Sequence, residues 1–291
     1  MNRELFAKQK TELMNKVLTF LQNIDRRILY VIVALVVCVP LIMMPNYHPK
    51  YIFQEVKNAY DIVDNMPDDK VALLSTIYSG STEVENGEQM RAILSHIFMK
   101  NKKCVILCWD TAGDRLTYDL ACEVSEKYNK VYGEDWVHIG YRIPNLQTML
   151  RGCGTDFQKT FKTDRNGTKL SDLPLTKNIK GAKDFGFVCE FTPSATLESW
   201  IAYFTEPYKV PLVYCPSAVL AASAYPYIDS GQIKGMLNGV IGASQYEVLI
   251  KEDKKPTKAG AMSLSLSLAH IIILVFILIG NIAFFLEKRL I

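Results

Sequence analysis

The chain has 291 residues, 49% of them hydrophobic, and its formal net charge is only +3 at pH 7. So small a charge, with no run of five or six like charges, argues against a nucleic-acid partner. The length allows one domain of about 200 residues with a proper core, together with two membrane-spanning segments.

The first 27 residues are predicted to form a basic amphipathic helix. Its apolar residues fall on one stripe, namely Phe6, Leu13, Val17, Phe20, Leu21 and Ile24. Two roles stay open for this helix. It lies in the headgroup region of an anionic leaflet, or it packs on a neighbouring subunit.

Residues 28–45 are predicted to be the first transmembrane helix and residues 261–286 the second. The first follows Arg26-Arg27 and contains Pro40, which removes one backbone hydrogen bond and predicts a kink. The second includes an uncharged run at 262–286, long enough to cross a bilayer, and residues 287–291 form a short basic tail. No convincing cleavage site follows the first span, so we interpret it as an uncleaved anchor of a two-pass cell-membrane protein.

The basic residues beside the two spans indicate the orientation. Arg26-Arg27 before the first span and Lys288-Arg289 after the second favour cytoplasmic termini and an extracytoplasmic central domain. The lysines within 251–258, on the domain side of the second span, argue the other way. Long domains translocate largely regardless of charge, so the double arginine at the first span receives more weight.

Residues 46–260 are predicted to form one soluble domain in which apolar strands alternate with helices. Strands are expected at 70–78, 103–109, 136–141, 185–191 and 210–215. Helices are expected at 83–99, 114–131, 195–204, 217–224 and 229–250, with a short helix from Pro144. This alternation predicts an α/β fold, a Rossmann-like three-layer domain whose five-stranded, mostly parallel sheet has the order 3-2-1-4-5.

In such a sheet ligands bind at the carboxyl ends of the strands. Polar residues follow the first three strands there: Ser79, Ser81 and Thr82, then Asp110, then Arg142. Together they form the candidate site for a small polar or anionic ligand. The alternatives are that Ser81 or Thr82 simply caps a helix and that Asp110 simply makes a turn.

The glycines Gly231, Gly235, Gly239 and Gly242 recur at helical spacing within the helix expected at 229–250. They are not a dinucleotide fingerprint, because no strand and tight turn precede them. Glycines four residues apart make one smooth helix face. That face packs either on the domain's own sheet or on another subunit.

The remaining candidates for chemistry give no catalytic or metal site. The cysteines are scattered without metal-ligand spacing, and we interpret them mainly as small core hydrophobes, with one disulfide left open. The histidines form no metal-binding pair, so neither a metal nor a cofactor is expected. The long polar segment 152–184 is either functional or an interaction arm.

The second span carries polar groups. His270 and Asn281 are eleven residues apart, about three helical turns, so they lie on one face of the helix. Polar residues inside a membrane ordinarily face protein. We therefore expect this face to meet the first span or a neighbouring subunit.

Several motifs in chain order resemble a known family. They are the Arg-Arg-led span, the sequence AYDI at 59–62, Gly140-Tyr141, the sequence YPY at 225–227, and the glycine series up to Gly242-Ala243. Together they resemble a family of uncharacterised prokaryotic membrane proteins in which two terminal spans bracket a Rossmann-like domain. The resemblance covers nearly the whole chain and implies architecture only, with no catalytic residue.

Three functions were weighed. The leading one is a non-enzymatic, membrane-anchored subunit of a homo-oligomer or larger membrane complex, with lipid as its other partner. The second is a membrane-anchored sensor of a small polar or anionic ligand at the carboxyl edge of the sheet. The third, a hydrolase or transferase using the same loops, lacks a nucleophile paired with a base.

Overall fold

The computed structural model describes residues 24–45, 47–142, 145–250 and 258–290, and its chain divides into two compact units. One unit is formed by the terminal segments, 1–47 with 261–291, and the other is residues 48–260. Most of the amphipathic helix predicted over residues 1–27 lies outside the described residues.

The domain at 48–260 is built on a six-stranded sheet in which every paired strand is parallel. The strands are β1 (Val71–Thr76), β2 (Lys103–Cys108), β3 (Trp136–Tyr141), β4 (Phe185–Thr192), β5 (Leu212–Pro216) and β6 (Gly235–Met236). Their order is β3-β2-β1-β4-β5-β6. The predicted order of the first five strands is confirmed, but the prediction of five strands is wrong, because β6 extends the sheet beside β5.

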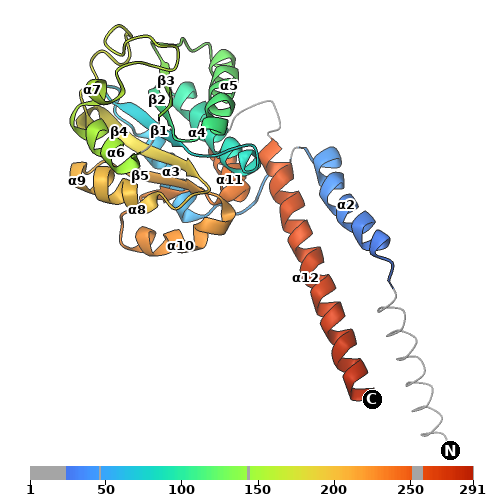
Figure 1. Ribbon diagram of the computed structural model, residues 1–291. Helices are drawn as coiled ribbons and strands as arrows, with labels where there is room; N and C mark the ends of the chain where they lie inside the picture. The colour runs from blue at the N-terminus through green and yellow to red at the C-terminus, as the bar shows by residue number, and fades with distance from the viewer. Residues whose placement is uncertain (1–23, 46, 143–144, 251–257, 291) are drawn as a thin grey trace, which may run out of the picture. The chain divides into compact units, whose positions relative to one another are not determined.

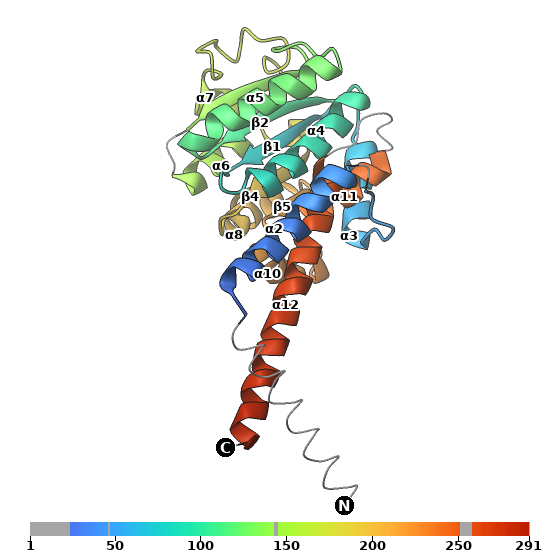
Figure 2. The ribbon, with the colours of Figure 1, turned by 90° about the vertical axis from the view of Figure 1, so that its right-hand side faces the viewer.

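Helices cover both faces of this sheet (Figure 1). The core on one face includes residues of α3 (Gln54–Asp64), α4 (Glu88–Met99), α5 (Thr111–Lys127) and α11 (Gly239–Ile250). The core on the other includes residues of α6 (Leu146–Thr155), α7 (Phe157–Phe161), α8 (Leu197–Trp200) and α10 (Ala218–Asp229). Figure 2 shows α4 and α5 lying across β1 and β2. The shorter elements are the π-helices η1 (Glu83–Gly87) and η3 (Ile201–Thr205), the 3₁₀ helix η2 (Ala182–Asp184) and α9 (Glu206–Tyr208).

The strands are largely apolar because both faces are covered, and the exceptions include Lys103 at the exposed start of β2 and the buried Glu190 in β4. In β1, Ala72 and Leu74 belong to one core cluster, whereas Leu73 belongs to the cluster on the opposite face. All six residues of β1 are buried. A strand buried on both sides carries no polar face, which is typical of parallel sheets.

The helix predicted over 229–250 is present from Gly239 onward, whereas the prediction of helix over 230–238 is wrong. The chain leaves α10 at Asp229, turns, forms β6 and begins α11 only at Gly239. Gly231 has φ +75° and Gly239 has φ +49°, and this left-handed backbone interrupts a right-handed helix. Glycine spacing alone therefore predicted a continuous helix where two glycines act as breakers.

The terminal unit contains two helices long and apolar enough to cross a membrane, α2 (Arg26–Met43) and α12 (Lys258–Leu290). They contact each other through small residues. The Ser265 hydroxyl donates to the Val37 carbonyl oxygen at 3.0 Å, and Ala261 and Ser263 are buried nearby on α12. Small side chains let two helix backbones approach closely within a bilayer.

Candidate functional site

The loop after β1 carries three of the predicted ligand residues. Ser79 Oγ lies 3.1 Å from Ser81 Oγ, and both side chains are accessible. Thr82 precedes η1 but makes no side-chain capping bond, and its buried hydroxyl has no hydrogen-bond partner. The capping alternative therefore does not describe Thr82. A buried hydroxyl without a partner costs about 1–3 kcal/mol, which is a reason to look for a ligand or water at this loop.

Asp110 is the N-cap of α5. Its Oδ1 accepts hydrogen bonds from the backbone N–H groups of Ala112 at 2.7 Å and Gly113 at 3.0 Å. These are two of the donors that a helix start leaves unpaired inside the helix. The carboxylate therefore caps α5, a role that differs from the turn considered as its alternative.

Arg142 is half-buried and holds the chain after α7 against β3. Its Nη2 donates to the Thr163 carbonyl at 2.6 Å, and Nη1 donates to the Tyr141 carbonyl at 3.3 Å. Burial lowers the pKa of the guanidinium, while Asp114 and Asp164 act in the opposite direction. Through these hydrogen bonds, Arg142 holds the loop at Thr163 in place.

The five predicted ligand residues follow β1, β2 and β3, which are neighbours in the sheet. Only the serine pair of the β1 loop is joined by a hydrogen bond. Asp110 and Arg142 bond to backbone groups of their own surroundings. The structure therefore places all five at one edge of the sheet without showing a shared site.

The structure shows a polar network around His138 of β3 that was not predicted from the sequence. The Gly140 N–H donates to His138 Nδ1 at 2.9 Å, so the ring proton is on Nε2, which donates to Thr117 Oγ1 at 2.9 Å. Asp114 accepts from the Tyr141 N–H and from Arg165 Nε, both at 2.8 Å. Burial lowers the pKa of His138 to about 4, which keeps the ring neutral. The network joins α5 and β3 to the segment at 165 and has a structural purpose.

A second network, Asp64–His96–Tyr246, joins α3, α4 and α11. His96 Nε2 lies 3.2 Å from Asp64 Oδ1, and Nδ1 lies 2.7 Å from the Tyr246 hydroxyl oxygen. The order carboxylate, imidazole, hydroxyl is that of an activated nucleophile. Tyr246, however, is fully buried, so no substrate reaches its oxygen. The Asp64–His96–Tyr246 network holds α3, α4 and α11 together.

Glu190 is the most unusual charged group in the domain. It lies on β4, fully buried, and its Oε1 accepts a 2.5 Å hydrogen bond from Thr196 Oγ1. Its Oε2 and the nearby Trp200 Nε1 have no hydrogen bond of ordinary geometry. Burial raises the pKa of the carboxyl to about 8, with Thr196 and Trp200 offsetting part of the rise. The burial of Glu190 and its bond to Thr196 depend on the fold and were not predicted from the sequence.

The cysteines are all free, and five of them are buried in the domain core. Cys189 and Cys215 lie on adjacent strands with their Sγ atoms 3.5 Å apart. Burial raises the pKa of the Cys189 thiol, so neither nucleophilic attack nor metal binding is favoured there. In the part of the chain that the structure describes, no group of three or more His, Cys, Asp and Glu residues is arranged to hold a metal ion.

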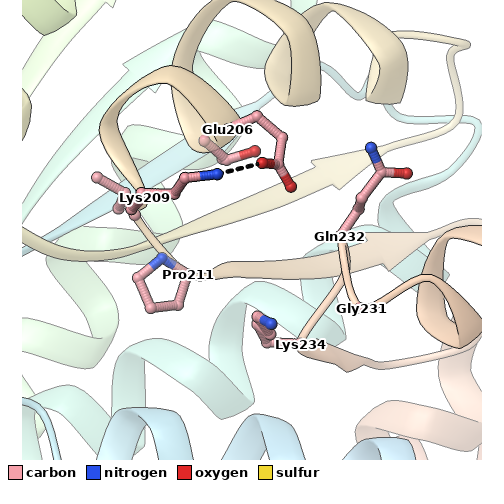
Figure 3. Close-up of a pocket in the computed structure, with 8 residues that line it drawn as sticks. Glu206, Lys209, Pro211, Gly231, Gln232 and Lys234 are labelled. Atoms are coloured by element: carbon pink, nitrogen blue, oxygen red, sulfur yellow. Dashed lines mark hydrogen bonds and ion pairs between the residues drawn. The ribbon is translucent and has the colours of Figure 1, made fainter.

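A pocket of about 260 Å³ opens at the amino ends of β5 and β6, away from the predicted ligand loops (Figure 3). Lys209 Nζ and Glu206 Oε2, three residues apart at α9, form an ion pair at 2.7 Å on one side of it, and Thr205, Gln232 and Lys234 add to its polar lining. The pocket offers both charge signs, but its principal cation and anion are already paired with each other.

The predicted assembly glycines pack inside the domain. A Cβ on Gly235 would lie 2.5 Å from the backbone nitrogen of Ala59, and one on Gly242 would lie 2.6 Å from the backbone carbon of Leu237. Gly239 is also buried, whereas Gly231 is in the half-buried turn after α10. Three of the four glycines therefore lie against neighbours within the domain, but they do not form one helix face.

His270 and Asn281 lie on α12 with exposed side chains. His270 Nδ1 is 2.8 Å from the Leu266 carbonyl oxygen of its own helix. The buried seam of α12 with α2 runs through Ala261, Ser263 and Ser265, toward the start of the helix. Within the described residues, α2 therefore does not cover the polar pair.

No protein-family model matches this chain, and no curated protein or solved structure is significantly similar to it.

Proposed function

We propose that the protein is a membrane-anchored, non-enzymatic subunit of an oligomeric assembly, most simply a homo-oligomer. The observation that carries this proposal is the exposure of His270 and Asn281 on a helix suited to cross a membrane. The hydrocarbon interior offers no water to satisfy these groups. Hydrogen-bonding groups on another polypeptide can satisfy them.

Hydrogen bonds to His270 and Asn281 contribute a modest free energy of association, and they favour one face of α12. Interhelical hydrogen bonds in membranes contribute on average roughly 0.6 kcal/mol and up to about 1.7 kcal/mol each. Because the two residues lie three turns apart on one face, both can meet the same partner helix. Two such bonds, added to close packing of apolar side chains, select one face of α12 for association.

In this proposal the anchored domain at 48–260 has a Rossmann-like fold. Its strand order and parallel pairing are those of doubly wound folds. The buried network around His96 joins three of its helices, and the network around His138 joins α5 to β3. We further propose that the termini are cytoplasmic and the domain extracytoplasmic, on the strength of Arg26 and Arg27 at the start of α2. Since the glycines pack within the domain, the spans are left as the principal assembly surface.

The test is a mass measurement of the full chain in mild detergent at micromolar concentration. We expect a species larger than one chain, which His270→Leu combined with Asn281→Leu shifts toward the monomer. Leu278→Ala, an apolar change at an exposed position of the same helix, is the matched control and should shift it less. A wild-type protein that runs as a monomer under these conditions would refute the proposal.

The second candidate is a sensor of a small polar or anionic ligand over the β1 loop. The buried, unpartnered Thr82 hydroxyl beside the accessible Ser79–Ser81 pair favours it. Ligand binding to the native state raises the melting temperature, and Ser81→Ala with Thr82→Val should remove that rise. Asp110→Asn keeps the helix cap and is the control. A metabolite screen that gives no rise in the wild-type protein rejects this candidate.

A further inference from the structure

The outer face of α10 is unusual for a helix at the surface of a water-exposed domain. From Pro216 to Ile228 the chain contains no charged residue. Only Ala221 and Ala224 of α10 are buried, whereas the side chain of Val219 is 88% exposed. Surface helices ordinarily place polar and charged residues on the face that meets water. Here Val219, Ala222 and Pro226 point outward instead.

This face lies next to the point where the chain from the first span joins the domain. The Tyr225 hydroxyl of α10 donates to Glu55 Oε1 at 3.3 Å, and Glu55 is in the first turn of α3. Residues 44–53 connect α3 to α2, a length of at most roughly 35 Å when fully extended. The start of α3 is therefore tethered within that distance of the end of the span.

The second connection leaves from the same region. The Phe53 backbone N–H donates to Gln245 Oε1 of α11 at 3.3 Å, and α11 is the last helix before α12. Both links to the apolar helices thus start from the side of the domain where α3 and α11 pack. The α10 face adjoins that side through Tyr225.

The connecting segment itself carries exposed aromatic residues. Tyr51 is 69% exposed and Phe53 is 40% exposed, and their rings meet edge to face with centroids 5.2 Å apart. Tyrosine is enriched at membrane–water interfaces, where its apolar ring and its polar hydroxyl are both accommodated, and Phe53 adds a second apolar ring. In water alone, these rings and Val219 would expose apolar area without compensation.

We propose that this surface, formed by Tyr51, Phe53, Val219, Ala222 and Pro226, rests in the headgroup region of the bilayer that holds the spans. The two tethers bring lipid to this side of the domain, and the absence of charge from Pro216 to Ile228 avoids the cost of desolvating ions there, since the charged residue of α10, Asp229, is its last. Lipid contact fixes the tilt of the domain on the membrane. It adds a function to the domain that is independent of subunit association.

The test uses the full chain in phosphatidylcholine vesicles. In a background with Cys38→Ala and Cys122→Ala, the only domain or span cysteines that are not buried are removed. An environment-sensitive fluorophore is then placed at Val219→Cys, at Ala222→Cys as a second site, or at Val131→Cys as the control. Val131 is 52% exposed and precedes β3, at the opposite end of the sheet from β5 and β6.

Quenching by a lipid with a nitroxide near its headgroup should be severalfold stronger at 219 and 222 than at 131. Quenching by aqueous iodide should show the reverse ranking. Equal iodide access at all three sites overturns the proposal. Protection of 219 and 222 from both quenchers also overturns it, because a second copy or another protein then covers the face. Two test sites keep the result independent of a single variant that fails to fold.

Discussion

The Tyr246 hydroxyl lies 2.7 Å from Nδ1 of His96, and both side chains are fully buried. Because His96 Nε2 faces the Asp64 carboxylate at 3.2 Å, the ring proton is on Nε2 and the tyrosine is the donor to Nδ1. Residues from the last helix of the domain and the first are thereby joined through one imidazole. The pair holds together segments that are far apart in the sequence.

Tyr246→Phe removes the donor and leaves the buried Nδ1 without a hydrogen bond. A buried group left unsatisfied costs about 1–3 kcal/mol, so the free energy of unfolding should fall by this amount. Urea unfolding of the protein in detergent measures it. Tyr227→Phe is the control, because the Tyr227 hydroxyl bonds Glu198 at the exposed surface and its loss should cost less. Equal effects of the two changes would contradict this role for His96 and Tyr246.

His96 should also make the domain sensitive to acid. Burial lowers the pKa of His96 to about 4, although Asp64 opposes this, while Lys100 adds to the lowering. The folded state therefore binds fewer protons than the unfolded state, whose histidine titrates near 6.5. Stability from this group is complete above pH 6.5 and is lost as the pH falls toward 4.

The measurement is the pH dependence of urea unfolding in wild type and His96→Gln. The variant should lose less stability between pH 6.5 and 4 than the wild type, whatever its absolute stability at neutral pH. His138, whose pKa is also lowered to about 4, continues to contribute in the variant. Parallel pH profiles for the two proteins would rule out a contribution of His96.

The sheet could be predicted from the sequence because each long strand is marked by its own run of apolar residues. Apolar runs such as residues 104–108 of β2 are buried on both faces, and their alternation with helices leaves few topologies. β6 was missed for a physical reason. It has two residues, Gly235 and Met236, and is held as a strand by its pairing with β5 and by contact with Ala59, neither of which a local pattern records.

The candidate site was less predictable because side-chain roles depend on partners brought together by the fold. The sequence located Asp110 and Arg142 at strand ends, but not the backbone groups that they bond. Glu190 lies in the strand Phe185–Thr192, and the sequence does not indicate which groups its carboxyl contacts. His96 and Asp64 are 32 residues apart, so no short spacing indicates their contact.

Gly235→Ala should destabilise the domain. A Cβ at this position would lie 2.5 Å from the Ala59 backbone nitrogen and 2.6 Å from its Cα, and a backbone cannot move aside as a flexible side chain can. Overpacking of this kind typically costs about 1–3 kcal/mol. Gly80→Ala is the control, since its Cβ would meet nothing within 4 Å. A loss of melting temperature in Gly80→Ala as large as in Gly235→Ala would argue against the close approach of α3 and β6.

Asp110→Ala should lower stability through the loss of a helix cap. The two backbone donors at Ala112 and Gly113 lose their acceptor, at a cost of about 0.5–2 kcal/mol. Asp110→Asn retains a capping oxygen and should be nearly neutral. Thermal unfolding of both variants without added ligand distinguishes this role from ligand binding. An unchanged melting temperature in Asp110→Ala would show that the cap contributes little, and that the Asp110 carboxylate is available to bind a ligand.

Glu190→Gln should stabilise the protein at alkaline pH. Burial raises the pKa of Glu190 to about 8, well above the 4.5 of an ordinary glutamate, so the folded state holds its proton where the unfolded state has released it. The stability that this group provides is complete below pH 4.5 and is lost as the pH rises through 8, by up to about 1.4 kcal/mol per pH unit for one proton. Glutamine keeps an oxygen for the Thr196 hydroxyl and does not ionise.

Unfolding free energies from pH 5 to 9 provide the measurement. The wild type should fall relative to Glu190→Gln over this range, so that the variant is the more stable protein near pH 9. Glu206→Gln serves as the matched control, because Lys209 lowers the pKa of that exposed carboxyl and places its titration below the range. If wild type and Glu190→Gln keep a constant difference from pH 5 to 9, the carboxyl is ionised throughout and must have a partner charge or water that stabilises it in the core.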